Sequence, residues 1–425
     1  MTQVKSPAEG LVAEVSRPLV FGELTILIAT SGLLAISGDY HPLTESGAAP
    51  TVLVKETNPG SGVLAPPVRF EQLYRHPELR YTVWRPVAPA GYRAMTDVLR
   101  HKNEEAPTPS NTHLWCVKET KVNGWSYAHI TDEASPVNLS VPFGSIAVPF
   151  WTVAAPAYTD VNSGVMIRPG LSVVWGGNPT SRPAGSPVQY VLNLPVTSVT
   201  GEEPERPVMP GYGKPVEKTP EMEDFRVKVP CLAIQDRHKD LAWQVKNSPT
   251  YTIRRLRCYS LVKHLHNESD VPQTTGRTVT YGISKSTTET YRESVGVSIG
   301  FETGVSIFGI GGTVSTTVST ELGYERSTQV SEMFEETHNE PLVVPPYKAA
   351  ALYCAHHKLQ VIREDDTLAG DHEGIDFDVR NSYLVLQYPP AQAAELAAQD
   401  GQGELAVGGG TFMDAPTPFQ INSTR

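Results

Sequence analysis

Cysteine is scarce in this chain of 425 residues, which contains only Cys116, Cys231, Cys258 and Cys354. Their spacings are wide and none forms a C-x-x-C pair, so the sequence gives no basis for a structural zinc site. We predict that each of the four lies in a strand as a small buried apolar residue. The pattern leaves room for one disulfide.

Long hydrophobic runs are also missing. Residues 24–36 read LTILIATSGLLAI, which is only thirteen residues and too short to cross a bilayer as a helix. The first residues, MTQVKSPAEGLVAEVSRPLVFGE, have no charged head followed by an apolar core and do not read as a secretory signal. We expect a protein that is made in soluble form, is released or secreted, and reaches a target-cell membrane later.

Positively charged residues are fewer than negatively charged ones, with 35 Lys and Arg against 46 Asp and Glu, so the formal net charge is −11. This balance argues against nucleic acid as a partner, and against simple electrostatic docking onto anionic lipid. No H-E-x-x-H zinc motif occurs, and the GIGG at 309–312 is not followed by the Lys-Ser/Thr of a phosphate loop. We therefore predict no enzyme activity, no cofactor and no metal.

Proline and glycine are abundant, with 36 and 34 residues, and long heptad patterns are absent. This composition favours a mainly β fold with many turns. An internal repeat supports it: VKET at 54–57 aligns with VKET at 117–120, and VWRPVAPAGY at 83–92 aligns with FWTVAAPAYT at 150–159. Three copies with a period of about 60–67 residues predict three small sheets that bury their apolar faces around a threefold axis, a β-prism.

The repeat WRPVAPAGYRAMTDV followed by HLWCVKET resembles that of the Vps62-like and MVB12-associated β-prism families. The resemblance covers roughly residues 20–200 and implies a prism that docks onto membranes or glycans. Its candidate receptor-binding residues are Trp84, Tyr92, Trp115 and Trp151. Two alternatives stay open, a prism that serves only as a scaffold and tryptophans that only pack the core.

Composition divides the chain into four parts. We predict a receptor-binding β-prism at 1–199, a proline-rich and charged linker at 200–225, an elongated β module at 226–394, and a flexible or removable tail at 395–425.

Residues 290–329 within the third part alternate between apolar and polar side chains. Because neighbouring side chains of a strand face opposite ways, the pattern predicts a hairpin with two chemically distinct faces. The predicted lipid-facing row is Val295, Val297, Ile299, Phe301, Val305, Ile307, Val314, Val318 and Leu322. The predicted lumen-facing row is Ser298, Glu302, Ser306, Ser315, Thr317, Ser319 and Glu321. The predicted tip is Phe308, Gly309, Ile310, Gly311 and Gly312.

The length of this hairpin favours a transmembrane role. A strand of thirteen residues reaches roughly 43 Å, and tilting by about 40° leaves about 33 Å of height, enough for an apolar band of about 25 Å. A lone hairpin has two open edges, so several copies must close into a barrel before lipid can surround them. Glu302 and Glu321 would then form carboxylate rings that favour cations, with Tyr291 and Tyr324 at the membrane interface.

This segment resembles the insertion loop of aerolysin-type β-pore-forming toxins, over about residues 226–390. The resemblance implies a homo-oligomeric pore in a target-cell membrane and a glycan or lipid receptor bound by the N-terminal part. A β-prism joined to such a module resembles bacterial insecticidal toxins. The alternatives are a soluble lectin-like binding or structural protein that never inserts, with the hairpin covering a sandwich, and an enzyme.

Two further clusters allow more than one interpretation. His264 with His266, and His356 with His357, are more typical of surface histidines than of metal ligands. The run Arg254-Arg255-Leu256-Arg257 predicts a solvated strand edge or a contact with a neighbouring copy in the ring.

Overall fold

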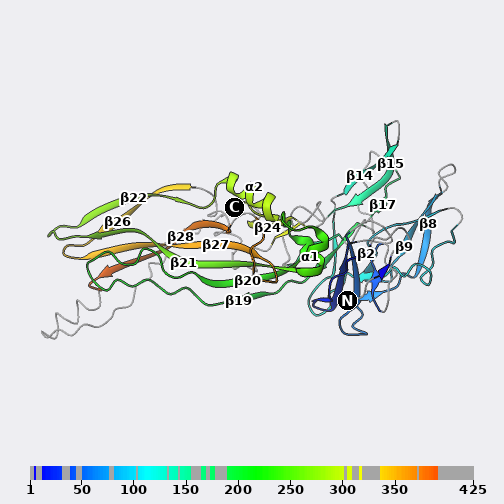
Figure 1. Ribbon diagram of the computed structural model, residues 1–425, viewed down its shortest axis with the longest axis horizontal. Helices are drawn as coiled ribbons and strands as arrows, with labels where there is room; N and C mark the ends of the chain where they lie inside the picture. Colours follow the sequence, from blue (N-terminus) through cyan, green and yellow to red (C-terminus); the bar gives the residue numbers. More distant parts are fainter. Residues whose placement is uncertain are drawn as a thin grey trace, which may run out of the picture.

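The computed structural model is an elongated molecule with its N-terminal strands gathered at one end of the long axis (Figure 1). It describes residues 4–5, 12–30, 39–44, 50–75, 81–101, 104–131, 134–141, 144–154, 164–168, 173–177, 189–300, 304–308, 315–317, 336–370 and 373–390. The described residues are mainly β, as predicted, with two α-helices and one 3-10 helix. The predicted tail at 395–425 lies outside them.

The first repeat contributes a four-stranded sheet of order β3-β4-β6-β5. Its strands are β3 (Leu19–Phe21), β4 (Leu24–Ala29), β5 (His41–Pro42) and β6 (Thr51–Glu56), preceded by the short pair β1 (Val4–Lys5) and β2 (Val12–Ala13). Strand β4 carries the run LTILIA, and five of its six side chains are buried. The stretch at 24–36 that is too short for a membrane helix therefore begins as a core strand.

The second and third repeats have the same topology. The second contains β7 (Leu64–Ala65), β8 (Arg69–Arg75), β9 (Tyr81–Val87), β10 (Tyr92–Arg93), β11 (Val98–His101) and β12 (Cys116–Lys118). The third contains β13 (Ala128–Ile130), β14 (Ala134–Val141), β15 (Gly144–Val153), β16 (Val165–Ile167), β17 (Val173–Trp175) and β18 (Tyr190–Leu194). In the second repeat, β12 pairs with β7 and β10, and β9 pairs with β8 and β11. In the third repeat, β18 pairs with β13 and β16, and β15 pairs with β14 and β17.

The strand pairing confirms the sequence alignment of the repeats. Val54, Val117 and Leu192 each lie at the same position of a central strand and are completely buried. The sheets β4-β6-β5, β7-β12-β10 and β13-β18-β16 contribute to one shared core. The prediction of three sheets was incomplete, because the second and third repeats each add a second sheet, β8-β9-β11 and β14-β15-β17.

The remaining chain forms the elongated module that runs along the long axis (Figure 1). Its main sheet has the order β19-β20-β21-β27-β28. These strands are β19 (Ser198–Thr200), β20 (Met222–Pro230), β21 (Thr250–His266), β27 (Ala349–Ile362) and β28 (Ile375–Tyr388). The 3-10 helix η1 (Cys231–Ala233) and helix α1 (Leu241–Asn247) join β20 to β21.

A separate two-stranded ladder, β22 (Gln273–Tyr281) with β26 (Glu336–Val344), packs over the distal part of this sheet through Leu342, Val344 and Leu352. All four cysteines are buried and free, which confirms their predicted burial and leaves no disulfide. Three lie in strands as predicted, whereas Cys231 begins the 3-10 helix η1. Burial raises the pKa of the Cys116 and Cys231 thiols to about 12, so both stay protonated.

Residues 201–221 do not simply connect two units. They run to the far end of the module, where Tyr212 contacts the rings of His266 and Tyr388, and then return along β21. On the return, Thr219 donates its backbone N–H to the Tyr259 carbonyl at 3.0 Å, and Tyr353 donates its hydroxyl to the Val216 carbonyl at 2.5 Å. The charged and proline-rich composition predicted an extended segment but gave no signal for this docking.

Candidate membrane-insertion segment and receptor-binding surface

The segment between β22 and β26 starts with a helix, α2 (Lys285–Val295), where a strand was predicted. The Ser284 hydroxyl accepts the Thr287 N–H at 3.1 Å and begins the helix, and Gly296 ends it with φ of 75°. A serine N-cap and a left-handed glycine at the end are ordinary helix boundaries. The sequence contained both helix-boundary signals. The alternation of apolar and polar residues that follows them led to the prediction of a strand instead of the helix. Val295 is therefore the last helical residue rather than a strand residue.

The predicted first arm is also not one strand in this structure. Strand β23 (Val297–Gly300) pairs with β24 (Gly304–Phe308), so the chain reverses between Gly300 and Gly304. Strand β25 (Ser315–Thr317) then pairs with β24 on its other side. The prediction of an uninterrupted thirteen-residue arm is therefore wrong for this structure. The chain reverses a second time between β24 and β25, after Phe308 and near the predicted tip.

The two-faced pattern survives this folding. Val297 lies opposite Ile307, and Ile299 lies opposite Val305, so the apolar row keeps to one face of the small sheet. Val295, Val297 and Ile307 are completely buried in the main core. These three residues of the apolar row therefore pack inside the protein in this state, and the lipid-facing and lumen-facing roles stay predictions.

Many residues of the predicted hairpin lie outside the described residues. They are Phe301, Val314, Val318 and Leu322 of the apolar row, Glu302, Ser319 and Glu321 of the polar row, and Gly309, Ile310, Gly311 and Gly312 of the tip. The structure describes only the backbone at Ser298, Ile299, Val305, Ser306, Phe308, Ser315 and Thr317.

The junction of α2 and β23 is held from three directions. Tyr291, buried inside α2, donates its hydroxyl to the Leu359 carbonyl of β27 at 3.3 Å. Gln235 donates its N–H to the Val295 carbonyl at 3.1 Å. Gly370 has a φ of 77° and lies so close to Ser294 and Val295 that a Cβ there would overlap both. Sequence reasoning missed these contacts because they join segments far apart in the chain.

An ion pair fixes the loop that carries Gly370. Arg363 donates to both carboxylate oxygens of Asp236, at 2.6 and 2.9 Å, and Tyr251 donates its hydroxyl to the same group at 2.9 Å. Burial alone would favour the neutral carboxyl, but these hydrogen bonds hold the pKa of Asp236 below its ordinary value. The α2 junction thus packs against a rigid, charged support.

The candidate receptor-binding aromatics lie in different environments. Trp151 is only 6% exposed and packs with Met166 and Val174, so its ring is a core element, as the open alternative stated. Trp84, Tyr92 and Trp115 are half-buried. Tyr92 donates its hydroxyl to the Gly62 carbonyl at 2.5 Å, and Trp115 stacks on His41 at 3.8 Å. These three keep part of their surface available to a receptor.

The arginine run 254–257 is neither a solvated edge nor a free basic patch. It lies on β21, a strand with neighbours on both sides. Arg255 is buried and donates to both oxygens of Asp224 at 2.8 and 2.7 Å, while Arg257 approaches Asp224 at 3.3 Å. Arg254 donates to Gln360 at 2.9 Å. The three arginines therefore interact with Asp224 and Gln360 of the same chain.

Of the four histidines, only His357 differs from the predicted surface position. His357 is buried, and burial together with Arg255 and Arg257 lowers its pKa well below the ordinary value. Hydrogen bonds to Asp376 and Asp378 raise the pKa of His356 to about 9. His264 and His266 are half-buried. Among the residues that the structure describes, no group of three or more His, Cys, Asp or Glu side chains is arranged to hold a metal ion.

The pentapeptide Gly296–Gly300, GVSIG, matches the G-x-S-x-G pattern of hydrolases that use a serine nucleophile. In those enzymes the serine stands on a turn that leads from a strand into a helix. Here Ser298 lies within β23 and follows a helix, the reverse order. The pattern therefore lacks the backbone context that such chemistry needs.

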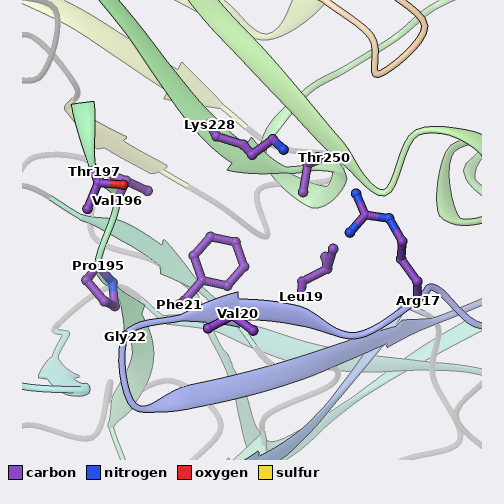
Figure 2. Close-up of a pocket in the computed structure, with 10 residues that line it drawn as sticks. All are labelled: Arg17, Leu19, Val20, Phe21, Gly22, Pro195, Val196, Thr197, Lys228 and Thr250. Carbon is purple, nitrogen blue, oxygen red and sulfur yellow. The ribbon is translucent and has the colours of Figure 1, made fainter. Parts of the chain in front are cut away.

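A cavity of about 270 Å³ lies where the N-terminal sheets meet the module (Figure 2). Leu19, Phe21 and Val196 form its apolar wall, with Lys228 and Thr250 facing them from the module. Beside it, Arg17 donates to Glu364 at 2.5 Å and joins the two parts of the molecule. Within the described part of the chain, no helix has the length and apolar character needed to cross a membrane.

These features describe an elongated β protein in which a segment with one apolar and one polar face connects the paired strands β22 and β26. Residues 227–363, about a third of the chain, match the model of the family described as Insecticidal Crystal Toxin, P42. The matched range contains residues 282–335 between β22 and β26, the candidate insertion segment, called the insertion segment below. The match supports a β-rich insecticidal toxin as the class of protein.

Two solved structures are similar to the chain. The crystal structure of Cry35Ab1 has 12% identity and a TM-score of 0.40, covering 94% of this chain and 92% of that chain. The crystal structure of GNIP1Aa from Chromobacterium piscinae has 14% identity and a TM-score of 0.28, covering 43% and 37%. No curated protein matches the chain.

Proposed function

We propose that this chain is a pore-forming toxin that binds a target-cell surface, oligomerises and inserts about residues 293–326 as a transmembrane β-hairpin. The family match over residues 227–363 supports insects as the target. Catalysis and a cofactor have no part in this function, which depends on assembly and insertion alone.

The observation that carries this proposal is the register of the β22–β26 ladder. Its nine pairs run from Gln273 opposite Val344 to Tyr281 opposite Glu336, at the base of the insertion segment. Continued without slippage, the same register pairs Val295 with Leu322 and Ile299 with Val318. The chain then reverses at Phe308 and Gly309, within the tip that the sequence predicts.

The extended register aligns the ends of the two apolar rows. Val295 and Leu322 are the last apolar residues of their rows, and the next residues on that face are Glu293 and Tyr324. An aromatic and a charged residue at the same level suit the membrane interface. The opposite face collects Ser, Thr and Gly together with Glu302 and Glu321, which suits a water-filled, cation-favouring lumen.

Assembly follows from the backbone. A hairpin of two strands leaves N–H and C=O groups unpaired on both edges, and lipid offers them no partner. Copies joined edge to edge remove those edges, so a closed ring of identical chains must form. Each chain supplies two strands, which gives an even strand number.

We assign target recognition to the N-terminal unit, as a three-repeat β-prism-type domain that binds a glycan or a lipid headgroup. Trp84, Tyr92 and Trp115 support this role because part of each ring is accessible. Trp151 has no such role because its side chain is buried.

The experiment that tests insertion compares two neighbouring charges. We expect Val318→Lys, which places a lysine on the lipid-facing row, to cost about 2–4 kcal/mol per chain near the bilayer centre and to abolish dye release from vesicles. Ser319→Lys, one residue away on the lumen row, should still release dye. Both variants should bind vesicles of insect gut-cell membrane like the wild type. Equal leakage by the two variants would show that the assigned face is wrong.

The second candidate function is a soluble lectin-like binding protein that never inserts. One observation favours it, namely that Val297 and Ile307 are completely buried, as expected for a segment that only packs. The same experiment separates the two functions. A lectin-like protein would bind the vesicles and release no dye at any concentration.

A further inference from the structure

The insertion segment touches the N-terminal unit through two edge strands. Among the described residues, β25 has one paired neighbour in the sheet β23-β24-β25, and β16 has one in the sheet β13-β18-β16. These two edges lie side by side, and β16 also lies next to η1. The third repeat therefore packs against β25, the end strand of this small sheet.

The same place shares one buried core. Val165 and Ile167 of β16 belong to the cluster that contains Val297 and Ile307 of the insertion segment, and all four side chains are completely buried. Met166, between Val165 and Ile167, belongs to a different cluster with Trp151 and Val174 inside the third repeat. Strand β16 thus has one face toward the shared core and one toward its own repeat.

An open strand edge is a template for pairing with another chain, and an apolar row exposed to water promotes association. Contact with β16 limits both risks as long as the two parts of the molecule stay together. We propose that strand β16 of the third repeat is an intramolecular lock on the insertion segment. Separation of the N-terminal unit from the module then precedes release of the segment. The biological purpose of the lock rests on the proposed pore-forming function.

The interface between the two parts also contains ion pairs that offer little resistance to opening. Its ion pairs are partly exposed: Arg17 with Glu364 at 2.5 Å, and Lys246 with Glu14 at 3.7 Å. Such pairs contribute little stability each. Beside Arg17 lies the cavity lined by Leu19 and Phe21, across which Lys228 and Thr250 of the module face the N-terminal strands (Figure 2). The apolar core at β16 is therefore one part of the contact that holds the N-terminal unit, the module and the insertion segment together.

Hydrogen exchange of the soluble protein tests the lock without any membrane. We expect Ile167→Ser to increase exchange of peptides covering residues 297–317 by at least about tenfold, while β21 and β27 exchange as in the wild type. The matched control is Met166→Ser on the same strand, which should increase exchange within the third repeat and leave 297–317 unchanged. No increase with Ile167→Ser, or the same increase with both variants, would overturn the proposal.

A crosslink provides a second test that does not depend on how Ile167→Ser folds. Ile167→Cys is combined with Ser315→Cys or Thr317→Cys, and the pair that crosslinks completely is used; the four native cysteines are buried. The oxidised protein should release vesicle dye at least about tenfold more slowly than the reduced protein. Undiminished leakage from the fully crosslinked protein would refute the lock. If the reduced protein and the wild type also fail to leak, the pore-forming function is wrong, and the exchange data still decide the lock.

Discussion

Val297 on β23 lies directly opposite Ile307 on β24, and both side chains are completely buried. In the register set by β22 and β26, Val297 would instead lie opposite Thr320. The two pairings exclude each other, because residues 297–308 form two antiparallel strands in this structure and would form one continuous strand in the extended register. The proposed insertion therefore requires that β23 and β24 separate and that α2 unwinds.

Crosslinks can distinguish the two pairings. Ile299→Cys with Val305→Cys matches the observed sheet, and Ile299→Cys with Val318→Cys matches the extended ladder. Since residues directly opposite have Cβ atoms about 4.5–5.5 Å apart, each pair should crosslink only in its own state. We expect the first to form in solution and block dye release. The second should form only with membranes and leave release intact. Formation of the second pair in solution would contradict the register switch.

The contact of Gly370 with the end of α2 predicts a large effect of a single methyl group. Gly370→Ala should lower the free energy of unfolding by about 2 kcal/mol or more, because φ is 77° and the new Cβ would overlap Ser294 and Val295. Gly60→Ala is the matched control, with φ of 85° and no atom within 4 Å. It should cost about 1 kcal/mol. Urea denaturation measures both, and equal losses would argue against a tight packing role for Gly370.

The buried pair of Arg255 and Asp224 should matter more for stability than the exposed pairs of the same sheet. Their side chains are each 4% exposed, so Asp224→Asn leaves a buried guanidinium with a neutral partner. We expect a loss of about 3 kcal/mol in the free energy of unfolding. Glu223→Gln, whose partner Arg226 is exposed, should cost under about 1 kcal/mol. A loss with Asp224→Asn no larger than this control would contradict the assignment.

His356 should make the module less stable at alkaline pH. Asp376 and Asp378 raise its pKa to about 9, above the ordinary 6.5. A raised pKa stabilises the fold fully below about pH 6.5, and this contribution is lost as the pH rises through about 9. We expect the wild type to lose about 1–2 kcal/mol more than His356→Gln between about pH 6 and about pH 9.5, measured by urea denaturation. Identical losses would show that His356 does not titrate in this range.

The internal repeat was readable from the sequence because strand order and turn positions recur with it. Val54 and Val117 aligned in the sequence, and both occupy the centre of a three-stranded arrangement. The extra sheets β8-β9-β11 and β14-β15-β17 were not predicted. Alternating side chains identify strands, but they do not say which strands pair when several short ones follow each other.

The insertion segment shows where sequence reasoning has a limit. Alternation correctly identified which side chains share a face, and this holds for Val297 and Ile307. It did not identify the helix that ends at Val295, although Ser284 and Gly296 are cap residues. The segment contains cap residues that favour the helix and an alternating pattern that favours a strand. The packing around it decides which of the two forms. Here the surroundings are the supporting loop with Gly370 and the third repeat with Ile167.

By itself, the sequence determined the mainly β class, the burial of the cysteines, the repeat of the N-terminal unit and the two faces of residues 297–307, since all of these depend on local side-chain order. Only the tertiary structure decided that Arg255 and His357 are buried, that Trp151 is a core residue, and that Val297 and Ile307 lie buried in the core that β16 shares. Those outcomes depend on contacts between residues far apart in the chain, where burial and partner geometry outweigh local preference.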